Sequence, residues 1–251
     1  AGFQVIMTEI ARPTVIRRAV AFAQAVYSGT ITVEGVSGSL AHGPEEALQL
    51  AREGKIAVLV DPRAEVIKAL RPQIVVDAIL AKANLGTSRD QAPIVIALGP
   101  GFTAGRDAHA VVETKRGHYL GRVIWQGEAI ANTGTPGEVM GYAGERVLRA
   151  PAAGIFRGCK AIGDPVTAGE TVARVNDIPV TAKISGVLRG ILHDGLEVTP
   201  GMKAGDIDPR GERDYCFTIS DKARAIAGGV LEAILHLQKR SGEKPNYTPL
   251  P

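Results

Sequence analysis

The chain has 251 residues, of which 45% are apolar and 22% are charged, and its formal net charge is +3. This length is enough for one large domain or two modest ones with sizeable cores. The small net charge argues against a nucleic-acid partner, and the sequence lacks an apolar run of the roughly 18 residues that would span a membrane.

The first residues, AGFQVIMTEI, have no basic region ahead of their apolar run, so we do not expect a secretory signal peptide. They also lack a starting methionine, which indicates a fragment or a processed chain. The two cysteines, Cys159 and Cys216, are far apart in sequence. We interpret both as structural, and we expect a reducing, cytoplasmic setting.

Residues 1–100 alternate between apolar runs and helical patterns, which is typical of a parallel sheet with both faces covered. We therefore predict a Rossmann-like parallel sheet whose first strand is missing from this chain. The expected elements are strands at 3–10, 30–36, 55–61, 73–80 and 93–99 and helices at 13–29, 44–54 and 64–71.

Polar residues and glycines follow the expected strand ends, where such sheets bind ligands. Glycines of the loop GPGFTAGR (99–106) would let backbone N–H groups face an anion, and Lys82 would add a point charge. We expect a nucleotide or another phosphate-bearing ligand in a crevice there; a tight turn without a ligand is the alternative. The spacing GxGxxxG is not the dinucleotide fingerprint. The predicted cofactor-binding residues are Lys82, Asn84, Thr87, Gly99, Gly101, Thr103, Gly105, Arg106 and Glu9.

Glu9 has two interpretations. An acid at the end of the second strand of a Rossmann unit can bind a ribose, about twenty residues after the glycine fingerprint. That fingerprint would precede Ala1, so a solvated strand end is the alternative that we favour.

Residues 107–149 change character, with strands predicted at 107–114 and 119–127. His109 and Glu113 would lie about 13 Å apart along one strand, which is too far for both to bind one metal ion. His118 could approach Glu113 across the hairpin, but two ligands do not make a metal site, so we predict none. The hairpin tip that contains Arg116 is either solvated or in contact with an anion. The sequence identifies no catalytic residue.

Residues 154–169 and 186–201 repeat each other at an offset of 32, with identical residues that include Gly154/Gly186 and Val166/Val198. Such self-similarity indicates a duplicated unit, and we expect a small all-β barrel formed by the two copies. The residue pattern of this stretch resembles that of the biotinyl and lipoyl carriers, which have a barrel-sandwich fold. The tip between the copies, 175–182, lacks the lysine of those carriers, so we predict no covalent biotin or lipoate.

A helix is predicted at 221–239, with Ser220 as its N-cap and an apolar stripe along one side. The pair Gly228-Gly229 indicates close packing against another element. The tail 241–251 is polar and rich in proline, and we expect it to be loose. The predicted divisions are an α/β domain at 1–148 with a hairpin extension, a barrel-sandwich domain at 149–211, and a strand and helix at 212–251 that return to the first domain.

Long phrases of the sequence, among them VDAILAKANLGTSRDQAPIVIALGPGFTAG and DAHAVVETKRGHYLGRVIWQG, resemble the accessory (maturation) protein family of selenium-dependent molybdenum hydroxylases. The resemblance covers almost all of residues 1–238. It implies a maturation factor that binds an anionic ligand or a nucleotide and docks a client molybdenum hydroxylase, with no membrane or nucleic-acid partner. A homo-oligomer is compatible with it. The alternative is a nucleotide- or nicotinamide-dependent enzyme.

Overall fold

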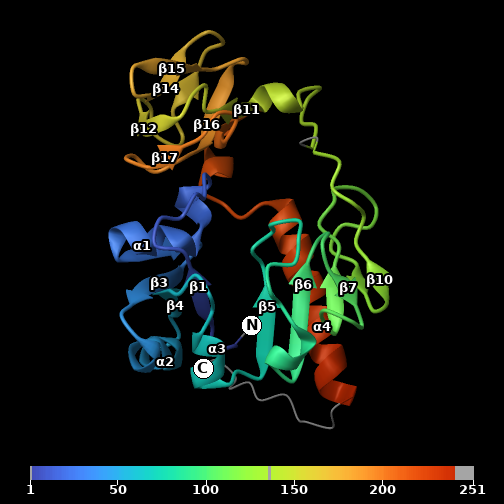
Figure 1. The fold of residues 1–251 in the computed structure, drawn as a ribbon. Coiled ribbons are helices and arrows are strands. Elements are labelled where there is room, and N and C mark those ends of the chain that lie inside the picture. Colours follow the sequence, from blue (N-terminus) through green and yellow to red (C-terminus); the bar gives the residue numbers. More distant parts are fainter. Residues whose placement is uncertain (1, 135–136, 241–251) are drawn as a thin grey trace. The chain divides into compact units, whose positions relative to one another are not determined.

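The computed structural model describes residues 2–134 and 137–240, so the predicted loose tail lies outside the described residues (Figure 1). The chain forms two compact units, and each of them combines segments that are far apart in sequence. Unit 1 comprises Ala1–Phe3, Ala64–Gly134 and Ser220–Pro251, and unit 2 comprises Gln4–Arg63 and Thr135–Ile219. This division differs from the predicted boundaries at 148 and 211, because the first strands cluster with the second half of the chain.

The central element of unit 1 is a four-stranded sheet with the order β5-β6-β8-β9. Its strands are β5 (Ile74–Asp77), β6 (Ile94–Leu98), β8 (Ala110–Val112) and β9 (Val123–Ile124). The strands β5, β6 and β8 are parallel, and β9 is antiparallel to β8. All residues of β6 and β8 are buried, as expected for strands that are covered on both faces.

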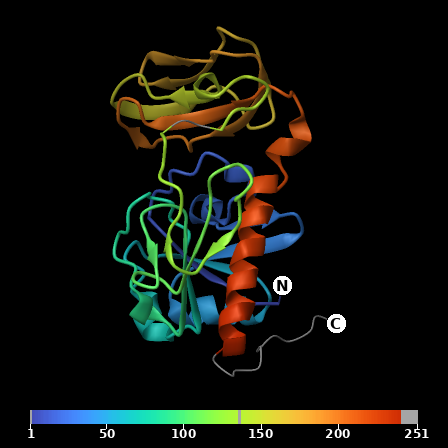
Figure 2. The same ribbon diagram turned by 90° about the vertical axis from the view of Figure 1, so that its right-hand side faces the viewer.

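The long helix α4 (Asp221–Arg240) covers one face of this sheet (Figure 2). Its apolar stripe, with Ile226 and Ile234, packs on the core, and the amide of Ala223 donates to Ser220 Oγ at 3.2 Å, so the predicted cap is present. A Cβ on Gly229 would lie 2.1 Å from the carbonyl oxygen of Gly121. The helix therefore approaches the chain after β8 at backbone distance, which needs glycine at this position.

The other face of the unit 1 sheet packs against the chain that connects β6 to β8, through buried residues such as Phe102 and Ala104. Short elements complete the unit: α3 (Val66–Leu70), the 3-10 turn η3 (Arg89–Gln91), β7 (Thr103–Ala104) and β10 (Gly127–Glu128).

Residues 4–63 of unit 2 form a second four-stranded sheet with the order β1-β4-β3-β2. Its strands are β1 (Ile6–Glu9), β2 (Thr30–Val33), β3 (Val36–Ala41) and β4 (Ile56–Val60). The predicted helix at 44–54 is present as α2 (Pro44–Arg52), with Pro44 in its first turn. The predicted helix at 13–29 is mostly absent. In its place are η1 (Arg18–Val20), η2 (Phe22–Gln24) and the single turn α1 (Ala25–Ser28).

Residues 147–208 of unit 2 form two antiparallel sheets around one hydrophobic core, with the orders β11-β18-β16-β13 and β15-β14-β12-β17. The strands are β11 (Val147–Arg149), β12 (Gly154–Gly158), β13 (Pro165–Val166), β14 (Thr171–Val175), β15 (Ile178–Thr181), β16 (Gly186–Ile191), β17 (Glu197–Val198) and β18 (Lys203–Asp208). The two copies of the repeat pair reciprocally, because Gly154 lies opposite Val198 and Gly186 lies opposite Val166. A short turn, η5 (Arg213–Cys216), follows.

The predicted fold class, a Rossmann-like parallel sheet plus a biotinyl/lipoyl-like barrel-sandwich domain, is wrong. The expected parallel strands separate into two mixed sheets in different units. The antiparallel sheets are also not made by the two repeat copies alone, since β11 precedes the copies and β18 follows them.

A hairpin explains part of this error. The predicted strand 30–36 turns back at Glu34 and Gly35, whose φ angles are 45° and 81°. Positive φ at both central residues is the signature of a tight hairpin turn. The chain therefore continues as β3, antiparallel to β2, in a segment where no element was predicted before the helix at 44–54.

Within the described residues, no helix combines the length and the apolar character that crossing a membrane requires.

Candidate functional site

The candidate site is the edge of the unit 1 sheet where the parallel strands β5, β6 and β8 end. Parallel strands bring their carboxyl ends to a common edge. Asp77 closes β5, Gly99 follows β6, and Glu113 and Thr114 follow β8. The exposed fraction of Asp77, Glu113 and Thr114 is 6%, 2% and 8%, so polar groups are buried at this edge.

Gly101 and the backbone around Lys82 are in direct contact at this edge. A Cβ on Gly101 would lie 2.7 Å from the Cα and the amide nitrogen of Ala83 and 2.8 Å from the carbonyl carbon of Lys82. The φ of Gly101 is +106°, which side chains rarely adopt. The predicted meeting of Lys82 with the loop after β6 is therefore present, and only glycine fits at position 101.

Gly99 is held against the end of β8 in the same way. A Cβ at this position would lie 2.5 Å from Thr114 Oγ1, and the Gly99 amide donates to the carbonyl of Val112 at 2.9 Å. The chain leaving β6 thus runs close to both neighbouring strand ends.

Asn84 and Thr87 organise the loop that carries Lys82. Asn84 Oδ1 accepts from the amides of Gly86 and Thr87 at 2.9 and 2.7 Å, and Asn84 Nδ2 donates to the carbonyl of Thr87 at 2.8 Å. Thr87 Oγ1 donates to Asp77 Oδ2 at 2.5 Å. These polar groups are satisfied within the loop, so their contribution to ligand binding would be to position Lys82.

The loop 99–106 does not surround a single anion site, because β6 and β8 are parallel. The chain that leaves β6 at its carboxyl end must return to the opposite edge before β8 can begin. Gly105 already lies at that opposite edge, where its carbonyl accepts from Arg89 Nη1 at 2.8 Å, and η3, which contains Arg89, precedes β6.

The side chains of Thr103 and Arg106 are engaged near that opposite edge. Thr103 Oγ1 donates to Glu128 Oε1 at 2.8 Å, and the Thr103 amide donates to Asp107 Oδ2 at 2.7 Å. Arg106 binds Asp107 with two hydrogen bonds of 2.9 and 3.0 Å. The structure therefore separates Thr103, Gly105 and Arg106 from Lys82, Gly99 and Gly101.

Glu9 belongs to unit 2, whereas the other predicted binding residues belong to unit 1. It closes β1, and its Oε1 accepts from the amide of Ile10 at 2.8 Å. This contact fits the interpretation of Glu9 as the polar end of a strand.

Lys222 and Glu113 are two residues of this edge that the sequence-based site did not include. Glu113 Oε1 accepts from the amide of Lys115 at 2.7 Å, and its Oε2 accepts from the amide of Ile130 at 2.8 Å. Lys222 lies in the first turn of α4 and is half-buried. The position of a helix start against a sheet edge is a tertiary property, so no local signal identified Lys222.

The electrostatics around Lys222 place several charges together. Burial lowers the pKa of Lys222, and the positive charge of Arg116 lowers it further, whereas the carboxylate of Glu113 raises it. The charge of Lys82 also lowers this pKa. Arg116 binds Asp221 through hydrogen bonds of 2.6 and 2.8 Å. Among the described residues, no hydrogen bond or ion pair engages the ammonium groups of Lys82 and Lys222.

His109 and Glu113 occupy opposite ends of β8 and have separate partners. His109 Nδ1 accepts from the amide of Val95 at 3.0 Å, and burial lowers the pKa of His109, which favours the neutral ring that this contact needs. No group of three His, Cys, Asp or Glu side chains suited to a metal ion occurs in the part of the chain that is described.

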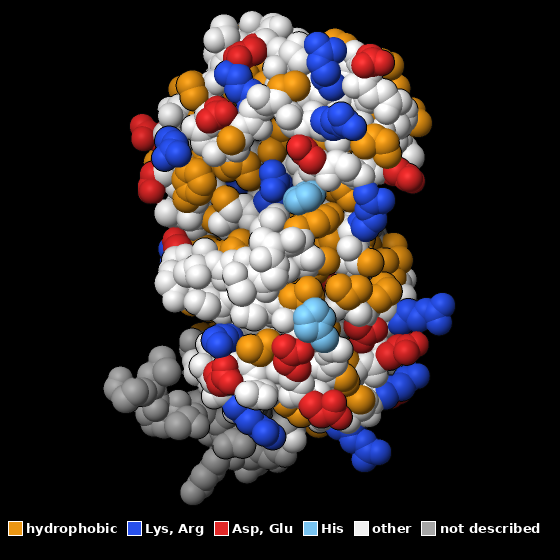
Figure 3. All heavy atoms as spheres, turned by 90° about the vertical axis from the view of Figure 1, so that its left-hand side faces the viewer, with side chains coloured by type: hydrophobic (Ala, Val, Ile, Leu, Met, Phe, Trp, Pro, Cys, Tyr) orange, Lys and Arg blue, Asp and Glu red, His pale blue; other side chains and the backbone are white. Residues whose placement is uncertain are grey.

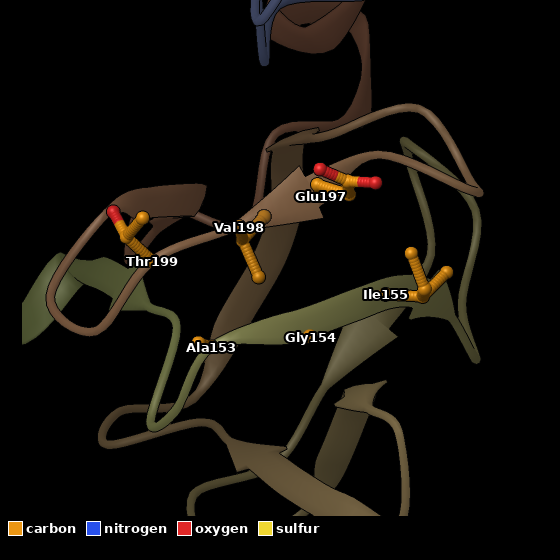
Figure 4. Close-up of a pocket in the computed structure, with 6 residues that line it drawn as sticks. All are labelled: Ala153, Gly154, Ile155, Glu197, Val198 and Thr199. Atoms are coloured by element: carbon orange, nitrogen blue, oxygen red, sulfur yellow. The ribbon is translucent and has the colours of Figure 1, made fainter.

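A pocket of about 530 Å³ lies elsewhere, in unit 2 (Figure 4). It is formed where β12 meets β17, and it contains none of the predicted binding residues. Its lining residues are Ala153, Gly154, Ile155, Glu197, Val198 and Thr199.

No protein-family model matches the chain. The uncharacterized protein YqeB of Escherichia coli (strain K12) is 56% identical to it over 237 residues. The match covers 94% of this chain and 44% of YqeB, so the chain spans less than half the length of this relative.

Solved structures of low similarity include a succinylglutamate desuccinylase/aspartoacylase from Rhodobacter sphaeroides, with 13% identity, coverage of 82% of this chain and 84% of that one, and a TM-score of 0.27. The ectoine utilization protein EutE (DoeB) from Ruegeria pomeroyi has 12% identity, coverage of 82% and 85%, and a TM-score of 0.26. Likenesses this low establish neither a shared fold nor a shared function.

Proposed function

We propose that this chain is an accessory factor in the maturation of a selenium-dependent molybdenum hydroxylase, and that unit 1 binds a nucleotide or another small phosphate-bearing anion. The family resemblance of the sequence supports the first part. The carboxyl edge of β5, β6 and β8 supports the second. The single observation that carries it is the half-buried Lys222, whose ammonium group has no hydrogen-bond or ion-pair partner among the described residues.

The charge balance at this edge favours an anion. Lys222 is half-buried, and its pKa is lowered by burial and then by the charge of Arg116, so its positive charge is costly there. A phosphate group would offset this cost through charge-assisted hydrogen bonds. The first turn of the twenty-residue helix α4 adds a partial positive charge of the same sign.

The partner that we propose is a client protein, and the setting is cytoplasmic. On the face shown in Figure 3, Lys and Arg side chains are interspersed with Asp and Glu side chains, whereas a nucleic-acid-binding face gathers basic side chains. This mixed surface and the small net charge of +3 support a protein client over a nucleic acid.

Calorimetric titration with inorganic phosphate and with ATP tests the anion site. Lys82→Gln and Lys222→Gln should each weaken phosphate binding about 10- to 100-fold, since a hydrogen bond to a charged group contributes roughly 1.5–3 kcal/mol. Lys68→Gln is the matched control, because Lys68 is an exposed lysine of α3 in the same unit. Equal phosphate affinity in all three variants would refute the site.

The maturation role needs a separate test in a bacterium that makes a selenium-dependent molybdenum hydroxylase. Deletion of the gene for this chain should lower the activity and the selenium content of the purified hydroxylase. The unchanged gene should restore both, and the Lys82→Gln/Lys222→Gln double variant should not. A fully active client in the deletion strain would rule this role out, and turnover of ATP or a nicotinamide by the purified chain would favour the enzyme alternative.

A further inference from the structure

A group of buried charges in unit 2 is not used by the proposed function. It joins the segment before η1 to β16, β18 and η5, and its cations outnumber its carboxylates. We call it the arginine cluster, and its members are Arg17, Arg146, Arg189, Arg210, Asp206 and Asp208.

Three of the four guanidinium groups have carboxylate partners. Arg146 binds Asp206 with hydrogen bonds of 3.2 and 3.1 Å. Asp208, which is fully buried, binds Arg210 at 2.6 Å and Arg189 at 3.3 Å. Asp208 is therefore shared by two arginines.

Within the described part of the chain, Arg17 has no carboxylate in hydrogen-bonding contact. Its Nη2 donates to the backbone carbonyls of Tyr215 and Thr218 at 3.0 and 3.2 Å. These contacts orient the guanidinium group, but a carbonyl oxygen does not neutralise its charge. Burial, followed by the like charge of Arg189, lowers the pKa of Arg17 to about 10, although the charges of Asp206 and Asp208 act in the opposite direction.

Backbone contacts bring Arg17 and Arg189 together. The amide of Ile191 donates to the carbonyl of Ile16 at 2.9 Å. A Cβ on Gly190 would lie 2.9 Å from the same carbonyl oxygen, so the two chains touch at backbone distance. Ile16 precedes Arg17 and Gly190 follows Arg189, which makes the two arginines neighbours.

Each of these two arginines has a buried donor that is not used. Among the described residues, the Nε atoms of Arg17 and Arg189 are buried and have no hydrogen-bond partner. The whole Arg189 residue is only 9% exposed. A buried N–H group needs an acceptor, and two of them on neighbouring guanidinium groups favour an acceptor that is itself negative.

We propose that unit 2 holds a small inorganic oxyanion of the sulfate or phosphate type between Arg17 and Arg189. A tetrahedral dianion supplies an acceptor oxygen to each Nε–H group and offsets the positive charge of the two guanidinium groups. Cys216 lies beside this site, since it is fully buried and its Sγ is 3.8 Å from the carbonyl oxygen of Leu188. The bound anion would thus join the segment before η1, β16 and η5 in unit 2.

Nuclear magnetic resonance of the arginine Nε–H groups tests this site directly. The sample is the full chain with Lys82→Gln/Lys222→Gln, which removes the anion site proposed in unit 1, so the two proposals can fail separately. Sodium sulfate replaces sodium chloride at constant ionic strength. The Nε–H signals of Arg17 and Arg189 should shift together along one saturating curve.

Arg18 is the internal control, because its Nε already donates to the carbonyl of Ile191 at 2.9 Å and should not respond. Absence of a shift at both Arg17 and Arg189 would overturn the proposal and indicate water as the acceptor. A common shift of all arginine signals would also overturn it, because that would be general screening by the salt.

Variants give a second measurement. Arg17→Lys keeps the charge but removes the Nε–H group, and it should weaken sulfate binding at least 10-fold when circular dichroism shows that unit 2 is folded. Arg18→Lys is the matched control and should retain the affinity of the parent chain. If Arg17→Lys does not fold, the signals of the unchanged arginines still decide the question. Equal affinity in the two variants would count against the site.

Discussion

Substitution of Gly101 by alanine is the sharpest test of the contact that forms the candidate site. Gly105 in the same loop provides a matched control. Both glycines are exposed and have positive φ, +106° for Gly101 and +89° for Gly105. They differ in their surroundings, because a Cβ on Gly101 would meet the backbone of Ala83 at 2.7 Å, whereas nothing lies within 4 Å of a Cβ on Gly105.

The two variants should therefore differ by the cost of the steric conflict. A non-glycine residue at such a φ costs about 1–3 kcal/mol, and this cost applies to both. Insertion of a methyl group into a closely packed position adds about 1–3 kcal/mol, and this cost applies to Gly101→Ala only. We expect Gly101→Ala to lower the free energy of unfolding by roughly 2 kcal/mol more than Gly105→Ala, which corresponds to a shift of about 1 M in the urea midpoint.

Urea unfolding followed by tryptophan fluorescence measures this difference in unit 1. Trp125 is the single tryptophan of the chain, and it packs against the core beneath α4. Phosphate titration of the same proteins should show a loss of binding in Gly101→Ala and unchanged binding in Gly105→Ala. Equal urea midpoints would refute the contact between the loop after β6 and Lys82, and the candidate site would lose its basis.

Two further predictions concern buried carboxylates. Glu113→Gln should destabilise unit 1 by about 1–3 kcal/mol, because the amide nitrogen of glutamine would face the backbone N–H of Lys115 or Ile130 and leave a donor unsatisfied; an unchanged urea midpoint would contradict this. Burial raises the pKa of Asp208, but its hydrogen bonds with Arg210 outweigh this and keep the pKa below its ordinary value. Its stabilising contribution should be complete above about pH 4 and lost as pH falls through the lowered pKa. Circular dichroism of acid unfolding should show a smaller loss of stability at low pH in Asp208→Asn than in the unchanged chain.

Local features of the sequence predicted the elements whose signals are local. The apolar stripe and the Ser220 cap predicted α4, which the structure has at Asp221–Arg240. Capping and helical periodicity depend on residues within a few positions of one another. The repeat also predicted equivalent strands, and the reciprocal pairing of Gly154 with Val198 and of Gly186 with Val166 shows them.

The strand order could not be predicted in the same way. An apolar run indicates a buried strand, but it does not state which strand is its neighbour or in which direction that neighbour runs. The turn at Glu34 and Gly35 introduced an antiparallel strand into one sheet, and the remaining strands formed a second sheet in another unit. Most strands were therefore predicted correctly, but their assembly into one Rossmann-like sheet was wrong.

The residues of the candidate site show which contacts could be predicted from the sequence and which depend on the tertiary structure. Lys82 and Gly101 were predicted to meet because both follow strands of one parallel sheet, and their backbones are in contact. The parallel return of the chain carried Arg106 to the opposite edge, although it is only five residues from Gly101 in the sequence. The packing of α4 brought in Lys222 from more than a hundred residues away. Proximity in the chain and proximity in space differ here because sheet order and helix packing, which depend on long-range contacts, decide which strand ends share an edge.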